Sequence, residues 1–367
     1  MYEGSRRGKR TLGTLLTETL ENIIEMDHAA EKMARDRWNH IAKPLHSLGL
    51  LEEQIVQIAG IRQNPFPSID RRILVVFCSD NGVVREGVTQ TGQETTALVA
   101  RNFLRGKTTA CIMCQRAGID VIPYDFGISV DTDVSMQYKI ACGTENMAEK
   151  PAMTREQAEI AIENGIRIAA ECHEKGYDLA AAGEMGIGNT TTSTAVICAL
   201  LSKAPEEMTG RGAGLSSEGL KRKIRVIQKA FDTLQPDPAD PLDVVSKTGG
   251  FDIAGMAGFY LGCARYHLPV ILDGFISNAA ALTAVRLCPA VNDYLIASHC
   301  SAEKAAKTVL HALGKIPPVQ AGICVGEGCG AAALVPLLDM ALDVYKKMYT
   351  FDDIAMESYK EQDMEDG

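Results

Sequence analysis

Residues 183–192 have the types and the spacing best suited to bind an anion. They read Gly-Glu-Met-Gly-Ile-Gly-Asn-Thr-Thr-Thr, after an apolar run at 178–182 that predicts a buried strand and before residues 193–201, which predict a helix. A glycine-rich turn between a strand and a helix directs several backbone N–H groups at one point, where the helix dipole also favours negative charge. The hydroxyls of residues 190–192 add donors at the helix start. The segment therefore predicts a phosphate site.

Comparison of this segment with known phosphate-binding motifs indicates which kind of phosphate it would bind. Its glycine spacing is that of a nucleoside triphosphate loop, but Asn189 and Thr190 stand where that motif has Lys and Ser or Thr. The dinucleotide fingerprint also fails, because Thr191 takes the place of its last glycine. A monophosphate is thus favoured. A plain turn that uses glycine for its backbone freedom stays open, although Glu184 beside an anion site favours a ligand with a second functional part.

Further polar residues follow other predicted strands. Continuous apolar runs predict strands at residues 73–78, 119–124, 268–272, 293–297 and 320–325. Ligands of open parallel sheets bind at the carboxyl ends of strands, so Ser-Asp-Asn-Gly at residues 79–82 is a candidate site. A simple turn is the alternative, since Asn-Gly is a turn dipeptide. Glu184 and Glu327 each follow or end such a strand, and we expect the fold to bring both carboxylates to one cleft.

One basic helix and two polar residues leave alternatives open. A helix predicted to have Ser216 or Ser217 as its N-cap contains Lys221, Arg222, Lys223 and Arg225. These side chains form a solvated face, or else Lys223 supplies the positive charge that the phosphate turn lacks. Ser301 suits a ligand contact and the N-cap of the next helix equally well. His299 is expected to be a structural residue.

The order of the predicted elements indicates an α/β fold. Strands alternate with helices over residues 73–348, which predicts a parallel sheet with helices on both faces. One of these helices is expected at residues 89–103, and another begins at Thr154, where a Gln three residues later completes a capping-box pattern. Apolar positions at helical spacing in residues 11–39 and 51–61 predict a helical lobe before the sheet.

Composition excludes several classes of protein. A chain of 367 residues with 46% hydrophobic residues can form one large domain with a smaller attachment, or two domains. A net charge of −10 argues against nucleic acid and anionic membranes as partners. Apolar runs stay far below the roughly 18 residues of a membrane span, and the polar, basic residues 1–10 do not resemble a secretory signal.

The cysteines indicate a reducing compartment. Eleven Cys are scattered through apolar contexts, as expected for reduced thiols in the cytoplasm. Cys111 and Cys114 have redox spacing, but they lie within a helical pattern, and no second pair follows at zinc-site spacing. We therefore expect buried small side chains there and no metal site.

Taken together, the motifs resemble those of the nicotinate-nucleotide:dimethylbenzimidazole phosphoribosyltransferase family. The resemblance covers, in order, residues 43–49, 80–88, 93–95, 151–154, 183–191, 210–215, 273–277, 299–303 and 326–331. It implies a large Rossmann-like α/β domain at residues 66–344, a small helical domain from residues 1–65 and 345–367, and a homodimer. It also implies transfer of phosphoribose from nicotinate mononucleotide to 5,6-dimethylbenzimidazole or a related base, with inversion at the anomeric carbon, without a cofactor or a metal.

The resemblance implies a role for each motif residue. Glu327 corresponds to the catalytic base, and Glu184 lines the same site. The donor's phosphate is expected to contact Gly186, Gly188, Asn189, Thr190, Lys223 and Ser301. The acceptor base is expected to lie against Ser79, Asp80, Asn81, Gln93 and Gly326. The rest of the donor is expected to lie against Asp273, Gly274, Phe275 and Ser277.

Three departures from the family pattern concern the acceptor. Asn81 stands where the family has His, His46 where it has Gly, and Thr91-Gly92 where it has a Tyr-Pro-like pair. Another acceptor, such as 5-methoxybenzimidazole, adenine or a phenol, is therefore an alternative. A non-catalytic nucleotide-binding protein is a second alternative, which the presence of both Glu184 and Glu327 disfavours.

Overall fold

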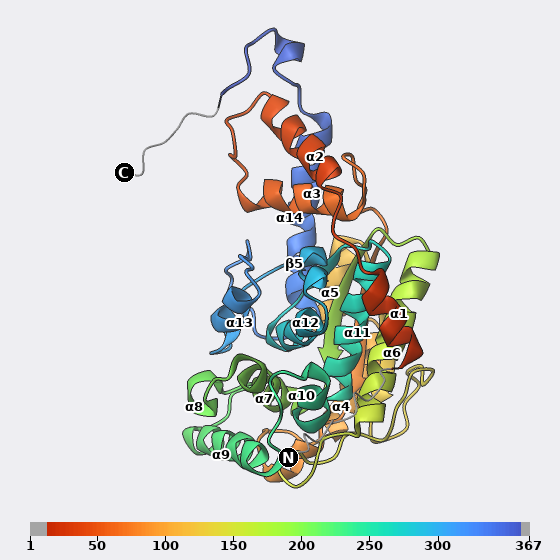
Figure 1. Cartoon of the computed structure of the whole chain (residues 1–367), viewed down its shortest axis with the longest axis vertical. Helices are drawn as coiled ribbons and strands as arrows, with labels where there is room; N and C mark the ends of the chain where they lie inside the picture. Colours follow the sequence, from red (N-terminus) through yellow and green to blue (C-terminus); the bar gives the residue numbers. More distant parts are fainter. Residues whose placement is uncertain (1–12, 361–367) are drawn as a thin grey trace, which may run out of the picture.

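The protein folds around one parallel sheet of five strands. The computed structural model describes residues 13–360, and Figure 1 shows helices packed around the sheet. The strands are β1 (Arg72–Ser79), β2 (Ile119–Gly127), β3 (Leu179–Met185), β4 (Val270–Leu272) and β5 (Leu295–Ala297). Their order is β2-β1-β3-β4-β5, and every pairing is parallel. The predicted α/β fold class is confirmed.

The central strands are buried on both faces. Side chains alternate along a strand, so Val75 and Phe77 of β1 belong to one hydrophobic core, while Leu74 and Val76 belong to the other. A strand covered on both faces reads as a continuous apolar run. This is why the run at residues 73–78 predicted β1 so closely.

Each face of the sheet is covered by its own set of helices. The first core joins the sheet to α6 (Arg155–Glu174), α7 (Asn189–Leu201), α10 (Pro241–Thr248), α11 (Phe251–Arg265) and α12 (Phe275–Leu287). The second joins it to α3 (Leu50–Ile61), α4 (Glu94–Leu104), α5 (Thr109–Ala117) and α14 (Cys329–Lys347). The predicted capping box at Thr154 is present at the start of α6. Glycines bring α6 and α11 together, because a Cβ on Gly165 would lie 2.0 Å from a backbone oxygen of α11.

Six further elements of the described chain, besides the first two helices, which are described below, lie outside these two sets of helices. They are η1 (Gly82–Glu86), α8 (Pro205–Met208), α9 (Ser217–Leu234), η2 (Pro289–Tyr294), α13 (Ala306–Ala312) and η3 (Asp352–Ile354). The basic helix α9 begins after Ser216, whose hydroxyl accepts a hydrogen bond from the N–H of Gly219. This agrees with the N-cap expected for that helix.

Segments from both ends of the described chain pack together at the narrow end in Figure 1. There α2 (His28–His40) and α3 meet the last turns of α14, with the rings of Trp38 and Tyr345 4.9 Å apart. Ile41 and Thr350 form an antiparallel bridge. By contrast, α1 (Thr14–Asn22) packs against α6 and α11. The predicted domain boundaries, 1–65 with 345–367 against 66–344, remain a prediction, and residues 1–12 and 361–367 lie outside the described part.

Three predicted elements differ from the structure. The predicted strand at residues 320–325 is wrong, because this segment is irregular, and the neighbouring Val319 forms only an isolated bridge to His299, beyond the end of β5. Ser301 is not a helix N-cap, since α13 begins later, with Ala305 as its N-cap. The helix expected at residues 89–103 begins only at Glu94, after a loop. An apolar run alone does not show whether a neighbouring strand is free to pair.

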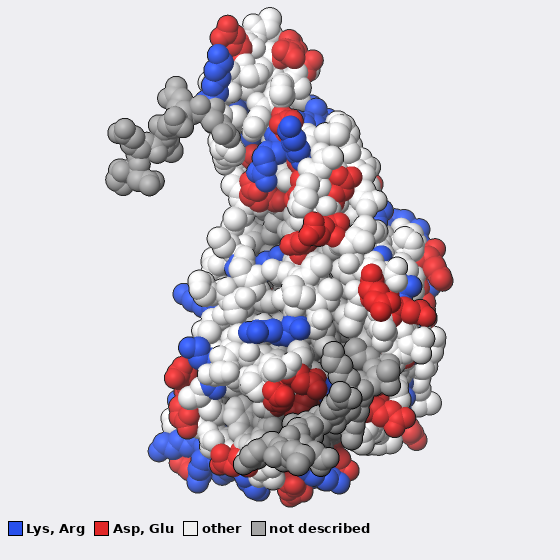
Figure 2. Space-filling model, viewed as in Figure 1, with Lys and Arg blue, Asp and Glu red and all other residues white. Residues whose placement is uncertain are grey.

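Three further features of the described residues concern membrane spans, metal ligands and surface charge. Within residues 13–360, no helix combines the length and apolar character needed to cross a membrane. Nor do those residues bring together three or more His, Cys, Asp or Glu side chains as a metal site would require. Figure 2 shows acidic and basic side chains mixed on the face that it draws, including the region of α8 and α9.

Candidate active site

A cavity of about 330 Å³ opens at the carboxyl ends of the strands. In the order β2-β1-β3-β4-β5, the chain reverses its direction of winding between β1 and β3, and open α/β sheets bind ligands at such a switch point. The cavity is lined from the turn after β3 and from loops that follow other strands. Its main segments are 88–91, 184–190, 211–215, 274–276, 299–303 and 324–327. A volume of this size fits a small organic ligand.

The turn after β3 is the segment for which the sequence predicted an anion site. Gly188 adopts a left-handed conformation, with φ of 96°, and α7 begins at Asn189. Lys223 of α9 donates from Nζ to Oγ1 of Thr190 at 2.9 Å. The Lys223 side chain is buried, and burial lowers its pKa to about 8 despite the opposing charge of Glu303. A desolvated ammonium group at a helix N-terminus is suited to an anionic ligand.

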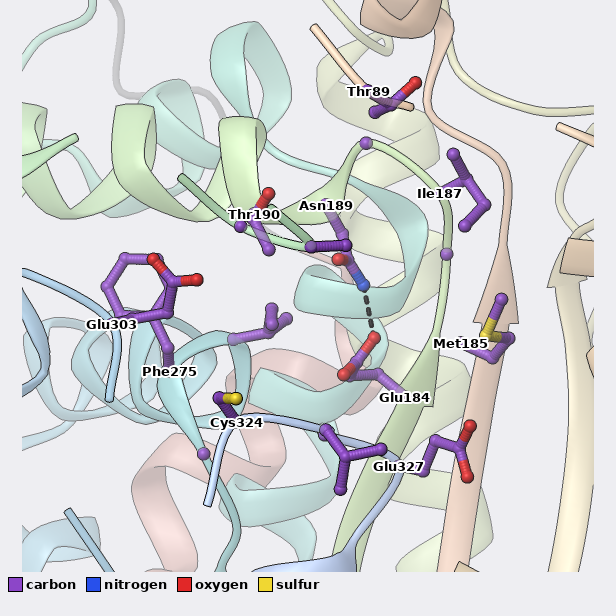
Figure 3. A pocket seen from close by; sticks show the side chains of 18 of the residues that line it. Thr89, Glu184, Met185, Ile187, Asn189, Thr190, Phe275, Glu303, Cys324 and Glu327 are labelled. Carbon is purple, nitrogen blue, oxygen red and sulfur yellow. Dashed lines mark hydrogen bonds between the residues drawn. The ribbon is translucent and has the colours of Figure 1, made fainter. Parts of the chain in front are cut away.

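Beside this turn, two buried acids share one amide group. The Nδ2 group of Asn189 donates to Oε2 of Glu184 (Figure 3) and also, at 3.1 Å, to Oδ2 of Asp252, which the figure does not draw. Burial raises the pKa of Glu184 to about 8, and the charge of Asp252 adds to this shift. Burial likewise raises the pKa of Asp252 to about 6. At neutral pH the pair therefore holds a proton, chiefly on Glu184.

Glu327 lies in a tight turn before α14 rather than at a strand end. Its φ of 64° is in the left-handed region, between Gly326 and Gly328, whose φ angles are also positive. Its Oε2 accepts from the N–H of Ala110, near the N-terminus of α5, at 3.5 Å. Burial raises the pKa of Glu327, and the charge of Asp273 acts in the same direction. Glu327 lines the same cavity as Glu184.

Asp273 holds the turn that carries Glu327. Its carboxylate accepts from the backbone N–H groups of Gly328 at 3.0 Å, Gly330 at 2.6 Å and Ala331 at 3.3 Å. Its own N–H donates to Oγ of Ser277 at 2.9 Å. Asp273 and Ser277 are buried and lie behind the cavity wall. Of the four residues predicted for the donor pocket, Gly274 and Phe275 line the cavity, and the other two support the turn.

The residues predicted around the acceptor base mostly lie beneath the surface. Ser79, Asp80 and Asn81 are buried, and only Gly326 of the predicted set lines the cavity. Asn81 packs against the turn after β3, since a Cβ added to Gly188 would lie 3.2 Å from the Cβ of Asn81. The amide group of Gln93 donates to the backbone oxygen of Asn81 at 3.2 Å. These residues therefore shape the turn from behind.

An apolar wall that sequence reasoning did not identify lies near Glu327. Val88, Val99, Met185, Ile187 and Val325 line the cavity. In Figure 3, Met185 and Ile187 lie on the same side as Glu327, while Thr190, Phe275 and Glu303 lie on the other. Met185 and Ile187 belong to the turn after β3, but Val88, Val99 and Val325 come from three other segments, so no local motif connects the whole wall. The cavity thus has a polar half, beside the turn after β3, and an apolar half that contains a carboxylate.

The predicted phosphate-binding residues lie together. Gly186, Gly188, Asn189, Thr190 and Ser301 line the cavity, and Lys223 reaches it through Thr190. Ser301 comes from the loop after β5, where its hydroxyl accepts from the N–H of Glu303 at 3.3 Å. Sequence reasoning missed Asp252 and Arg211, and it treated His299 as structural, although Arg211 and His299 line the cavity.

Comparison with known proteins gives a consistent result. A phosphoribosyltransferase family profile matches residues 23–355. A nicotinate-nucleotide–dimethylbenzimidazole phosphoribosyltransferase of Acetivibrio thermocellus is 46% identical over 95% of this chain and 100% of its own length. One of Ruminiclostridium cellulolyticum is 43% identical over 94% and 98%. The crystal structure of CobT from Thermus thermophilus superimposes with a TM-score of 0.85 at 37% identity, covering 90% of this chain and 99% of that one.

Proposed function

The chain belongs to the nicotinate-nucleotide:dimethylbenzimidazole phosphoribosyltransferase family, and we propose that it transfers phosphoribose from nicotinate mononucleotide to a benzimidazole-type base. The acceptor is 5,6-dimethylbenzimidazole or a close relative. The products are nicotinate and α-ribazole phosphate, which is the activated lower-ligand nucleotide of a cobamide. The reaction inverts the anomeric carbon.

We assign the donor's phosphate to the polar half of the cavity. The start of α7 presents backbone N–H groups there, and Thr190 and Ser301 offer hydroxyl groups. Lys223 supplies the positive charge. A buried ammonium group attracts a phosphate more strongly than one surrounded by water does. The negative charge of the phosphate also offsets the cost of desolvating the ammonium group. The phosphoribose would then extend toward Glu184 and Glu327.

We assign the acceptor base to the apolar half. A flat aromatic ring matches side chains such as Met185, Ile187 and Val325. One ring nitrogen of the acceptor forms a bond to C1′ of the ribose as the bond from C1′ to the pyridinium nitrogen breaks, and that bond's electron pair neutralises the pyridinium. The other ring nitrogen loses its proton to Glu327. The leaving group needs no acid, because it departs from a cationic ring.

Glu327 suits the role of general base better than Glu184 does. Burial raises the pKa of both carboxyl groups, that of Glu184 to about 8. Glu184 also accepts a hydrogen bond from Asn189, whereas Glu327 lies on the side of the apolar Met185 and Ile187, where the acceptor ring is assigned (Figure 3). A base should be ionised at the working pH and have a pKa close to it. The observation that carries the proposal is that Glu327 and Thr190 line one cavity, with the buried Lys223 behind Thr190 and donating to its hydroxyl.

A direct assay tests this function. The purified protein is mixed with nicotinate mononucleotide and 5,6-dimethylbenzimidazole, and nicotinate and the nucleotide product are measured by chromatography and mass spectrometry. We expect both products in equal amounts. Because a general base typically contributes about 10²–10⁴-fold, Glu327→Gln should lower kcat by that factor. Glu53→Gln, on the exposed face of α3, is the matched control and should leave kcat unchanged.

Two outcomes would contradict the proposal. Absence of nicotinate release by the unaltered protein would remove the function itself. A Glu327→Gln variant with full turnover would leave the function in place but remove Glu327 as the base. A panel with 5-methoxybenzimidazole, adenine and a phenol in the same assay determines the acceptor, since Thr91, one of the departures from the family pattern, lines the cavity.

We also propose that the enzyme is a cytoplasmic homodimer. All eleven cysteines are free, as expected in a reducing compartment. Leu98 and Leu104 of α4 and Ile112 of α5 are about half exposed, and exposed apolar side chains on neighbouring helices mark interaction surfaces. Sedimentation equilibrium should give twice the mass of the chain, and Leu98→Glu with Ile112→Glu should shift it to the monomer. A monomer before substitution would refute this.

A further inference from the structure

His299 lies in the cavity wall just after β5, two residues before Ser301. Its ring is buried, with only 2% of the residue exposed, yet it lines the cavity. Two backbones enclose the ring. A Cβ on Gly330 would lie 1.8 Å from Nδ1, and one on Gly274 would lie 3.7 Å from Nε2. Nε2 is therefore on the side of Gly274, which itself lines the cavity.

The neighbouring Ser298 determines which ring nitrogen carries the hydrogen. The Ser298 hydroxyl lies 2.6 Å from the carbonyl oxygen of Leu272 and 3.3 Å from that of Asp273. Carbonyl oxygens only accept, so the single hydroxyl hydrogen is directed at them. The 3.0 Å contact between Ser298 Oγ and His299 Nδ1 must then be a hydrogen bond that Nδ1–H donates. The neutral ring therefore has a lone pair on Nε2.

The charge state of His299 agrees with this arrangement. Burial lowers the pKa of His299, and the negative charge of Asp273 opposes this effect only in part. The ring is consequently neutral at physiological pH, and Nε2 acts as an acceptor. Within residues 13–360, Nε2 has no hydrogen-bond partner, so a ligand in the cavity would be its partner.

The chemistry of the donor limits what that partner can be. Nicotinate mononucleotide carries a carboxylate, a phosphate, a pyridinium ring and two ribose hydroxyls. The carboxylate and the phosphate are acceptors at neutral pH and would repel a lone pair. The pyridinium ring has no N–H. Only the ribose hydroxyls can donate to Nε2.

We propose that His299 is a specificity-determining residue that accepts a hydrogen bond from a ribose hydroxyl of the donor nucleotide. This inference rests on the proposed function, because it assumes a ribonucleotide in the cavity. The position of His299 supports it, since Ser301 of the predicted phosphate site lies two residues away and Gly274 and Phe275 adjoin it in the cavity wall. His299 thereby distinguishes a ribosyl donor from a deoxyribosyl one.

The test compares three donors with three proteins. The donors are nicotinate mononucleotide and its 2′-deoxy and 3′-deoxy analogues, and the proteins are the unaltered enzyme, His299→Ala and His299→Gln. The unaltered enzyme should lose about tenfold in kcat/KM with one of the deoxy donors, as expected for one neutral hydrogen bond. His299→Ala should lose about tenfold with the ribonucleotide and should no longer distinguish that pair. His299→Gln should keep part of the preference, because an amide oxygen can replace Nε2.

His173→Ala is the matched control. His173 is a histidine of α6 that stacks on Tyr266, and its loss should leave the preference among donors intact. A His299→Ala variant that keeps the full preference would overturn the proposal, as would an equal loss with all three donors. If Nε2 instead contacted the acceptor's N–H, His299→Ala would raise the KM for the base and leave the donor preference unchanged, which would also overturn it.

Two further measurements keep the test decisive. Should His299→Ala fail to fold, as judged by circular dichroism, the unaltered enzyme decides alone, because equal use of all three donors refutes the role of His299. Failure of the proposed function would appear separately, as no product from the unaltered enzyme and unmodified donor. The affinities of the same three nucleotides, measured by calorimetry, would then decide. Binding of the ribonucleotide about tenfold tighter than a deoxy analogue would support the proposed role of His299, and equal binding of all three would overturn it.

Discussion

Replacing Asp273 by Asn tests whether one buried carboxylate positions the general base. Asp273 does not line the cavity, but it accepts hydrogen bonds from the N–H groups of Gly328, Gly330 and Ala331. These residues follow Glu327 directly, in a turn where Glu327 has a left-handed conformation. Such a conformation persists only where the surrounding structure fixes it. Asp273 is therefore a positioning residue for Glu327.

The size of the effect follows from the contacts. A hydrogen bond to a charged group contributes about 1.5–3 kcal/mol, and one between neutral groups about 1 kcal/mol. In Asp273→Asn the amide oxygen can still accept from Gly330 and Ala331, but the amide NH₂ would face the N–H of Gly328. One charge-assisted bond is lost and two are weakened, so the free energy of unfolding should fall by about 3 kcal/mol.

Turnover should fall as well, and its pH dependence should shift. A displacement of about 1 Å at a reacting group can cost 10²-fold, so we expect kcat to fall about 10–100-fold. The charge of Asp273 raises the pKa of Glu327, in addition to burial. Glu327 must be ionised to accept a proton, so activity is lost as the pH falls below this pKa. Removing the charge lowers the pKa, and the acidic limb of the kcat profile should move to lower pH.

The assay needs a variant that weakens a similar contact elsewhere. Asp240 caps α10, where its carboxylate accepts from the N–H groups of Leu242 and Asp243 at 3.1 Å each. Asp240→Asn should reduce stability in urea unfolding and leave kcat and its pH profile unchanged. If Asp273→Asn lost stability but kept kcat within twofold and kept the same acidic limb, the carboxylate would support only the fold, and the positioning role would be refuted.

Three other substitutions give measurable outcomes. Lys223→Met should raise the KM for nicotinate mononucleotide at least tenfold by removing a charge-assisted contact worth about 1.5–3 kcal/mol; an unchanged KM would exclude Lys223 from phosphate binding. Gly326→Ala should reduce kcat more than tenfold, because its Cβ would lie 2.5 Å from Oε1 of Glu184, whereas Gly322→Ala, with similar positive φ but open space, should cost only backbone strain of about 1–2 kcal/mol. Glu184→Gln tests the buried proton. The stability that comes from the raised pKa of Glu184 is fully present below pH 4.5 and is lost as the pH rises to about 8. In urea unfolding, the stability of the unaltered protein relative to the variant should therefore fall between pH 4.5 and about 8.

Local sequence patterns predicted the parts of the site that are local in space. The phosphate turn is a strand, a glycine-rich turn and a helix start in succession, so residues 183–192 contain all the information that forms it. The continuous apolar run of β1 likewise follows from burial on both faces. The capping box at Thr154 forms within one helical turn. These local structures are confirmed, whereas phosphate binding at the turn stays a prediction.

Contacts between distant residues could not be predicted in this way. Asp273 was expected against the donor, but its carboxylate is engaged by N–H groups some 55 residues later in the chain. Asp252 of α11 shares an amide with Glu184, and nothing in its own helix marks it as part of the site. Residues 320–325 have the composition of a strand, yet they remain irregular after β5. Pairing and polar networks depend on the neighbours that the fold supplies.

The two halves of the cavity are built differently, and this has a consequence for substrate choice. The polar half depends on the backbone geometry at Gly188 and on the buried Lys223. Substituting either residue would therefore disturb the fold of the turn itself. The apolar half consists of side chains from separate segments, such as Val99 and Val325, which can change in size without breaking a backbone hydrogen bond. If donor and acceptor bind as proposed, backbone architecture fixes the choice of donor, whereas side-chain volume sets the choice of acceptor. Within this fold, a change of base is expected to require few substitutions, and a change of donor many.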